Sequence, residues 1–321
     1  MKGQAKKKFF RTSKFRTGIF LFTLLIIPLI HFIIFWVYVN VGTIASTFQH
    51  WNVMKGKMEW YGLTRYIEIF KEYVLGIDKV TGKWFTNPNR NIFWNSFRAI
   101  AINVIIFPLT IIASYAFYKK IPHEKFFRVC FYIPSLISIS VLALMFRNMF
   151  NADFGPITSI FSKILGYTPQ WLSADSNAMW TLIYLFCIWS GLGANVIMIS
   201  GAMLRIPNDI LEYSRLEGVG FWRELFQIVL PLIMPTVSVY LISILTSVFG
   251  LTLQPLMIAQ TTGVDNRYYT VGWYIFQSVQ GNSTSGMLSA STLGMVLTLF
   301  MLPIIIIARK VLKRLTPDVQ F

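Results

Sequence analysis

The sequence predicts an all-α polytopic membrane protein with six transmembrane helices and a helix-turn-helix in one polar loop. Hydrophobic residues make up 55% of the 321 residues and charged residues only 13%. A soluble domain carries about 25% charged residues. Six windows also reach the roughly 20 apolar residues that a spanning helix needs. These windows are Gly18–Val39, Arg98–Tyr118, Phe127–Phe146, Met179–Met203, Pro235–Leu256 and Met287–Ala308.

The windows divide the chain into a basic N-terminal tail (1–17), a transmembrane domain (18–308) and a C-terminal tail (309–321). Both tails, the turn between windows two and three and the polar loop 204–231 hold 18 of the 29 Lys and Arg residues. Basic residues mark the cytoplasmic side of a membrane protein, so we expect both termini in the cytoplasm and loop 41–97 outside. The same clusters favour contact with membrane lipid over nucleic acid, because they form no single aromatic-lined face.

Loop 204–231 is polar between two apolar windows and carries the signals of two short helices. Pro207 suits a helix start, because its fixed φ and missing N–H cost nothing there. Gly218 can take the left-handed conformation that closes a helix. The second helix then leads into Leu230-Pro231, where the fifth window follows.

The spacing of Glu212, Gly218 and Ile228-x-Leu230-Pro231 resembles the coupling loop of ATP-binding-cassette (ABC) importer permeases, E-A-A-x-x-x-G followed by I-x-L-P. Three further segments resemble its carbohydrate branch, which includes the larger maltose permease and polysaccharide-fragment permeases: Trp189-Ser190-Gly191, Leu204–Pro207 and Gln260–Gly263. Tyr213, Ser214 and Val219 stand where the family has alanine. An amphipathic helix on the bilayer surface is the alternative interpretation, but it does not require this spacing.

This resemblance implies partners and contact residues. The partners are a second homologous permease, two ATPase subunits, an extracellular solute-binding protein and an oligosaccharide substrate. ATP and Mg would be bound by the ATPase subunits, so this chain is expected to hold no cofactor and to be no enzyme. The residues expected to contact the ATPase are Glu212, Tyr213, Ser214, Glu217, Gly218, Leu230 and Pro231.

The distribution of charge also indicates an external energy source. The 13 acidic residues all lie outside the cores of the apolar windows, whereas ion-coupled carriers usually place an ionisable residue there. The chain has no phosphate-binding loop either, since Gly82-Lys83 is followed by Trp84 and Gly56-Lys57 by Met58. Its His and Cys residues show no metal-ligand or catalytic spacing.

Polar residues in windows four and five are the candidates for a substrate path. Hydroxyl, amide and aromatic side chains suit a sugar, and in relatives the sugar contacts come from these two spans. Hydrogen bonding between membrane helices is an equally good explanation for any one of them. The candidates are Tyr184, Trp189, Asn195, Tyr240, Thr246, Ser247, Thr252 and Gln254.

The sequence therefore favours a permease that forms half of the path of a bacterial ABC importer for an oligosaccharide, in the cytoplasmic membrane. One alternative is an importer of glycerol-phosphate or peptide. An anionic substrate would favour Arg or Lys facing the path, and windows four and five have none in their cores. The other alternative is a membrane receptor without transport, which has no reason to keep the coupling motif.

Overall fold

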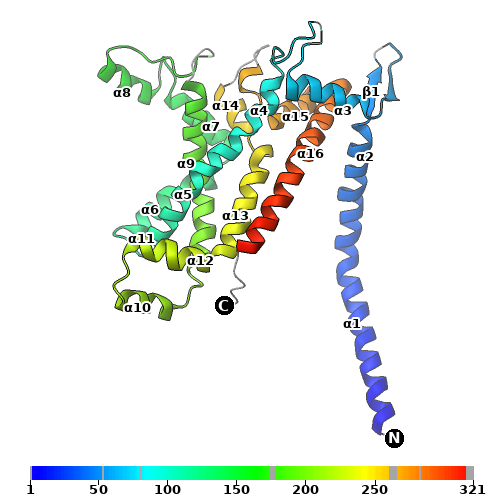
Figure 1. The fold of residues 1–321 in the computed structure, drawn as a ribbon, viewed down its shortest axis with the longest axis vertical. Helices are drawn as coiled ribbons and strands as arrows, with labels where there is room; N and C mark the ends of the chain where they lie inside the picture. The colour runs from blue at the N-terminus through cyan, green and yellow to red at the C-terminus, as the bar shows by residue number, and fades with distance from the viewer. Residues whose placement is uncertain are drawn as a thin grey trace. The chain divides into compact units, whose positions relative to one another are not determined.

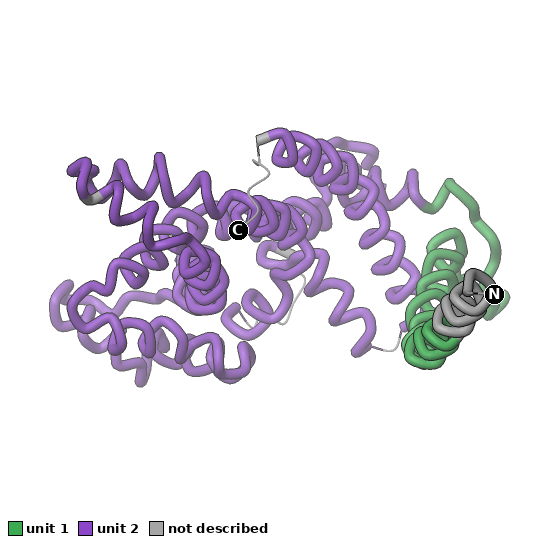
Figure 2. The backbone as a smooth tube through the Cα atoms, turned by 90° about the horizontal axis from the view of Figure 1, so that it is seen from below, with its two compact units in different colours: residues 1–65 green, residues 66–321 purple. Residues whose placement is uncertain are grey.

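The computed structural model describes residues 2–52, 54–79, 81–173, 178–259, 266–281 and 283–315. Two compact units are present, residues 1–65 and 66–321, and they are coloured separately in Figure 2. The family-like segment Gln260–Gly263 lies outside the described residues.

The first unit consists of one long helical segment and a small hairpin. The helical elements follow one another directly: α1 (Lys2–Phe32), the π-helical turn η1 (Ile33–Tyr38) and α2 (Val39–Ser46). Within them Arg16–Ser46 is long and apolar enough to span a membrane. Strands β1 (Gln49–Asn52) and β2 (Lys57–Trp60) pair antiparallel. This hairpin corrects the strictly all-α expectation for the first loop.

The second unit contains three further straight spans (Figure 1). They are α4 with α5 (Arg90–Ser96 and Arg98–Tyr118), α9 (Ala178–Met203) and α16 (Thr284–Leu315). Their positions match windows two, four and six, although span two begins one helix earlier than predicted. The elements α3 (Thr64–Ile69) and η2 (Phe70–Leu75) lie in the loop that precedes α4.

Window three is bent, and so is the chain where it enters window five; with each bent pair taken as one span, the described candidate spans number six. In window three, α6 (Glu124–Leu136) and α7 (Ile139–Met149) meet at 107°. Just before window five, the segment Phe221–Leu232 meets Met234–Phe249 at 83°. Proline favours such a break, because it cannot donate a backbone hydrogen bond; Pro134, Pro231 and Pro235 lie near the two bends.

The chain from α11 through window five is divided among several short elements. They are α11 (Phe221–Glu224), η3 (Leu225–Val229), α12 (Leu230–Leu232), α13 (Met234–Thr246), η4 (Ser247–Phe249) and α14 (Leu253–Ala259). The prediction of one helix over Pro235–Leu256 is therefore wrong at its end, because η4 closes with Gly250 and α14 begins anew. Thr252 and Gln254 consequently do not continue the helix of Tyr240.

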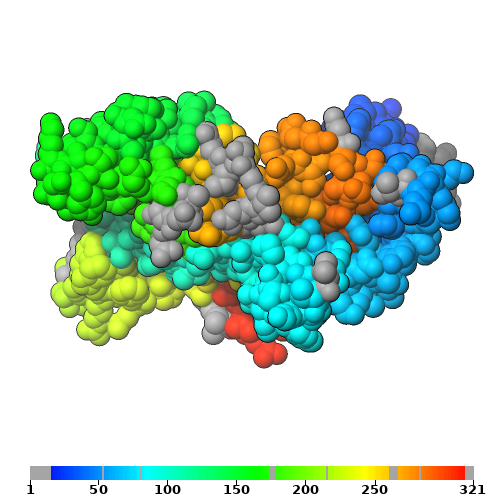
Figure 3. Space-filling model, turned by 90° about the horizontal axis from the view of Figure 1, so that it is seen from above, coloured from blue at the N-terminus to red at the C-terminus, as the bar shows by residue number. Residues whose placement is uncertain are grey.

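Short helices lie at the two ends of the second unit. Figure 1 shows α10 (Asn208–Leu216), α11 and α12 at one end, and α8 (Pro156–Leu165), α14 and α15 (Val271–Gln280) at the other. Figure 3 looks onto the latter end, where α14 is visible between the green α7–α8 segment and the orange α15. The 3₁₀ turn η5 (Asn266–Tyr268) precedes α15.

The buried core of this unit forms two clusters, one toward each end. The cluster at the α14–α15 end is centred on fully buried side chains such as Phe93, Phe186 and Trp273. The cluster at the α10–α12 end joins α5 and α9 to the loop through residues such as Tyr115 and Leu225. Each end of the bundle therefore has its own tightly packed support.

The close contact of α6 with α9 depends on a small residue. A Cβ at Gly193 would collide with the carbonyl oxygen of Phe131 on α6, whereas a Cβ at Gly201, on the same helix, would meet nothing within 4 Å. Small residues allow such backbone approach between membrane helices.

We expect Gly193→Val to destabilise the protein by about 1–3 kcal/mol, as overpacking in a tight interior does. Gly201→Val, the matched control on the same helix, should change stability little. Thermal unfolding of the two purified variants in detergent checks this. Equal unfolding midpoints for both variants would contradict the assigned contact.

Candidate functional site

Loop 204–231, called the coupling loop for its resemblance to that of ABC permeases, has the two short helices predicted for it, α10 and α11, joined at Gly218. Gly218 has a φ of 65°, in the left-handed region that favours glycine. The Val219 N–H bonds to the Ser214 carbonyl at 3.0 Å and the Glu217 N–H to that of Tyr213 at 3.1 Å. These bonds satisfy the last carbonyls of α10 and fix the direction in which the chain leaves it.

Helix α10 presents one face to the core and the other to the surroundings. Leu211 and Ser214 are buried, and the Ser214 hydroxyl donates to the Leu211 carbonyl at 2.8 Å. Tyr213 and Leu216 are 71% and 84% exposed. Because apolar side chains are so exposed at a loop, this face has the character of a protein-binding surface.

Most residues predicted to contact the ATPase lie on the surface. Leu230 is half-buried and Ser214 is the buried one. Ser214, which replaces the family's second alanine, is therefore buried within the chain. Tyr213, which replaces the first, is exposed on the surface. The exposed members are Glu212, Tyr213, Glu217, Gly218 and Pro231.

A nearly buried ion pair ties the loop to span two. The Lys119 Nζ at the end of α5 lies 2.6 Å and 2.8 Å from the two carboxylate oxygens of Glu224 on α11. The Glu224 side chain is only 3% exposed and that of Lys119 20%. Beside the pair, the rings of Tyr115 and Phe221 pack 4.6 Å apart. From the sequence, Lys119 and the basic residues near it were interpreted only as a marker of membrane orientation, so this ion pair was not predicted. Its only signal was an acidic residue, Glu224, beside apolar helix positions.

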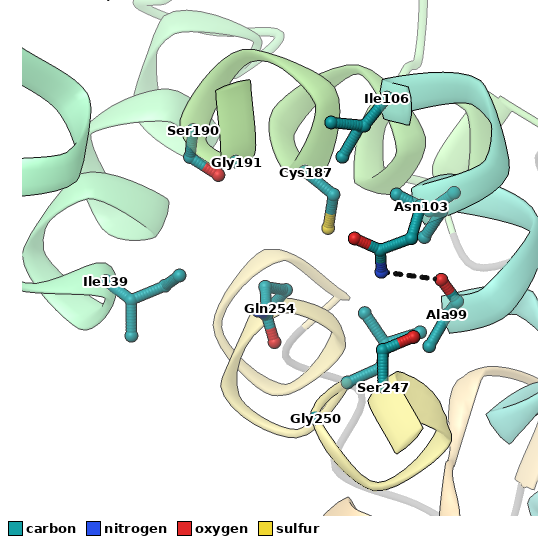
Figure 4. A pocket seen from close by; sticks show the side chains of 12 residues that line it. Ala99, Asn103, Ile106, Ile139, Cys187, Ser190, Gly191, Ser247, Gly250 and Gln254 are labelled. Carbon is teal, nitrogen blue, oxygen red and sulfur yellow. Dashed lines mark hydrogen bonds between the residues drawn. The ribbon is translucent and has the colours of Figure 1, made fainter. Parts of the chain in front are cut away.

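A cavity of about 200 Å³, with polar groups among mostly apolar side chains, lies at the opposite end of span five (Figure 4). Elements α5, α7, α9, η4 and α14 contribute its lining. Its members are Ala99, Ile102, Asn103, Ile106, Ile139, Cys187, Ser190, Gly191, Ser247, Gly250, Leu251 and Gln254. Four of these carry amide or hydroxyl groups, and none carries a charge.

The polar side chains of the cavity are held by their own helices. Asn103 Nδ2 donates to the Ala99 carbonyl at 2.8 Å, as drawn in Figure 4, and the Ser190 hydroxyl donates to that of Phe186 at 2.8 Å. Ser247 donates to the Ile244 carbonyl at 2.6 Å. In each case a donor is used locally while oxygen lone pairs stay available, so the cavity offers fixed acceptors to a ligand.

Gln254 supplies the complementary donor. Its Oε1 accepts from the Thr252 N–H at 3.2 Å, which orients the amide. Its Nε2 makes no hydrogen bond to another described residue. The cavity therefore combines acceptors on α5, α9 and η4 with an amide donor on α14.

Two of the eight predicted path residues, Ser247 and Gln254, line this cavity. Tyr184 instead bonds to Arg98, Asn195 to the Gly191 carbonyl, and Thr246 to the Ser243 carbonyl.

The remaining three path residues also lie outside the lining. Trp189 stacks near Phe146, and Thr252 lies in the turn before α14. Tyr240 is buried, with its hydroxyl 3.5 Å from that of Thr110. Asn103 and Ser190 also line the cavity but were not among the predicted path residues; a lone amide inside window two was the available signal.

The comparisons with known proteins agree on one class. The sequence profile of the family "Binding-protein-dependent transport system inner membrane component" matches residues 89–320. The "Probable ABC transporter permease protein YurN" of Bacillus subtilis is 27% identical over 237 residues, 72% of this chain and 76% of that protein. The "Arabinooligosaccharides transport system permease protein AraP" of the same organism is 23% identical over 281 residues, covering 87% and 84%.

Solved structures give the same picture of the fold. A chain of a bacterial ABC transporter involved in the import of the acidic polysaccharide alginate superposes with a TM-score of 0.78 at 18% identity. The superposition covers 95% of this chain and 99% of that chain.

We expect Glu224→Gln to destabilise the protein by up to about 3 kcal/mol, because it leaves the Lys119 charge without its carboxylate in a nearly buried place. Glu59→Gln is the control. It removes the partner of Lys55 in a pair that is 66% and 42% exposed, and solvent screens such pairs. Thermal unfolding in detergent should show a much larger shift for Glu224→Gln, and equal shifts would refute the role of burial.

Proposed function

Because this chain belongs to the binding-protein-dependent transport system inner membrane components, we propose that it forms half of the translocation path of an importer for oligosaccharides. The chain is a transport subunit of a multi-pass inner-membrane complex, not its ATPase. The observation that supports the substrate class is the uncharged cavity between α5, α9 and α14, in which four amide and hydroxyl side chains lie among apolar ones. Family membership leaves no place for the alternative of a receptor without transport.

An oligosaccharide fits the chemistry of this cavity. Sugar hydroxyls both donate and accept, and the cavity presents fixed acceptors beside the Gln254 amide, whose Nε2 bonds to no other described residue. Its volume lies below the roughly 300–1,000 Å³ of ordinary ligand pockets, so it holds only part of a sugar chain. A second, homologous permease would complete the path. Relatives named for arabino-oligosaccharides and for alginate support the class.

The coupling loop would face two ATPase subunits in the cytoplasm, which bind the ATP and Mg that this chain does not hold. The exposed Tyr213 and Leu216 supply an apolar contact on α10, with Glu212 and Glu217 beside it. The basic clusters favour cytoplasmic termini on the same side. A solute-binding protein would then deliver the substrate to the opposite end, which carries α8, α14 and α15.

A continuous set of packed elements links the two ends. Movement of α10 would reach α11 through the turn at Gly218, and α5 through the Lys119–Glu224 pair. From α11 the chain passes the 83° bend and continues through α13 to η4, where Ser247 lines the cavity. Closure of the ATPase subunits can therefore alter the cavity, as alternating access requires.

We expect Gln254→Ala to lower oligosaccharide import into proteoliposomes roughly 5- to 150-fold, because it removes a half-buried hydrogen-bonding group that lines the cavity, and the loss of such a group costs about 1–3 kcal/mol. Binding of the sugar to the separate solute-binding protein should not change. Thr246→Ala, whose side chain is exposed and bonds only within its own helix, is the control. Equal losses in both variants would show that the cavity is not the path.

We expect Gly218→Pro to abolish substrate-stimulated ATP hydrolysis by the assembled complex, since proline cannot adopt a positive φ. Glu212→Lys should do the same by reversing the charge at an exposed contact position. Both proteins should still insert into the membrane, because neither residue is buried. Stimulated hydrolysis at the wild-type rate in either variant would refute the coupling assignment.

A further inference from the structure

One cation of span two faces span four at the end of the cavity away from the coupling loop. Arg98 is the first residue of α5, and its guanidinium carbon lies 4.3 Å from the centre of the Trp180 ring on α9. Its Nη1 donates to the Tyr184 hydroxyl at 3.2 Å and its Nε to Asn95 Oδ1 at 3.3 Å. Three partners from two helices therefore hold this side chain in one place.

The helical spacing places this guanidinium directly beyond the cavity. Residues three and four apart share a helix face, so Arg98 lies on the face of Ile102 and Ile106, both of which line the cavity. On α9, Tyr184 similarly shares a face with the lining residues Cys187 and Gly191. The Arg98–Tyr184 contact is thus the next layer outward between the same two helices.

All the partners of Arg98 among the described residues are neutral. An aromatic ring, a phenol and an amide orient the guanidinium without cancelling its charge, and Arg98 forms no ion pair with any described residue. By contrast, the partly buried Lys119 meets the carboxylate of Glu224. Arginine carries five N–H donors, and two of them are used here. A partly buried, oriented positive charge with donors to spare is a site for an anionic group.

We propose that Arg98 binds a carboxylate of the substrate, so that the imported oligosaccharide is an acidic one built from uronate units. This inference rests on the proposed function and specifies its substrate class. The guanidinium fork matches a planar carboxylate in two parallel hydrogen bonds. One guanidinium also balances the single charge of a carboxylate, whereas a phosphate ester carries about −1.5 to −2 and the cavity lining adds no second cation.

This assignment changes the interpretation drawn from windows four and five, whose cores lack a cation. The cation comes from window two, at the edge of its apolar stretch, and the packing of α5 against α9 brings it to the path. Uncharged groups in the cavity would hold the sugar hydroxyls, while Arg98 selects the charge at the entrance.

The test measures import by proteoliposomes that contain the complete importer and its solute-binding protein. The probes are a tetrauronate, its fully methyl-esterified form and a neutral tetrasaccharide. Because the same binding protein serves every variant, its own preference cancels when each variant is compared with wild type. Arg98→Gln should lower tetrauronate import roughly 10-fold or more and leave import of the ester and the neutral sugar within about 2-fold. Arg98→Lys should restore part of the loss.

Arg90→Gln is the matched control, because Arg90 stacks on Phe85 and Trp94 and does not line the cavity. It should leave the ratio of acid to ester import unchanged. Equal loss of every probe in Arg98→Gln would show a structural role and overturn the proposal. If the wild-type importer takes up the neutral tetrasaccharide but not the tetrauronate, the proposal of an acidic substrate is wrong, while the proposed function of oligosaccharide import stands. Import of none of the oligosaccharides would overturn the proposed function itself.

Discussion

The absence of water within the bilayer is the constraint on which the rest of this structure depends. A polar group there must find its partner inside the protein. Asn103, Ser190 and Ser247 meet this demand by donating to carbonyls of their own helices. Each side chain is thereby fixed, and its oxygen still accepts. The same bonds that make these residues tolerable in a membrane helix therefore leave acceptor oxygens in the cavity, which suits the hydroxylated ligand that we propose.

Charged groups obey the same constraint in two different ways. Lys119 and Glu224 neutralise each other beside the packed rings of Tyr115 and Phe221, so the pair serves as a fixed joint between span two and the coupling loop. Among the described residues, only neutral groups orient Arg98, and no carboxylate pairs with it. In the proposed function, the Lys119–Glu224 ion pair transmits movement because its two charges stay together. Arg98 binds the substrate because its donors are not used by a carboxylate of the protein. Their positions, near opposite ends of α5, match these two roles.

The bent spans connect the two ends. If the chain ran as one straight helix from α11 to η4, the coupling loop and the cavity would lie at the two ends of a single rigid helix. The 83° bend instead lets α11 and α12 lie across the bundle at one end while α13 runs along it. At the other end, η4 closes at Gly250 and α14 turns back, which brings Ser247 and Gln254 to the same cavity. Breaks in spanning helices are tolerated where backbone groups face a cavity or other protein.

The sequence by itself determined the features that depend on composition and local conformation: the positions of six apolar spans, the two helices of the coupling loop and the left-handed turn at Gly218. Only the tertiary structure decided which polar side chains share a site. In a soluble helix, apolar residues recur every three to four positions and so mark the buried face. These membrane spans are apolar on every side and carry no such repeat. Their sequence therefore did not distinguish Ser247, which lines the cavity, from its neighbour Thr246, which does not. The partners of Arg98 and Glu224 come from distant segments, and no local pattern encodes such a meeting.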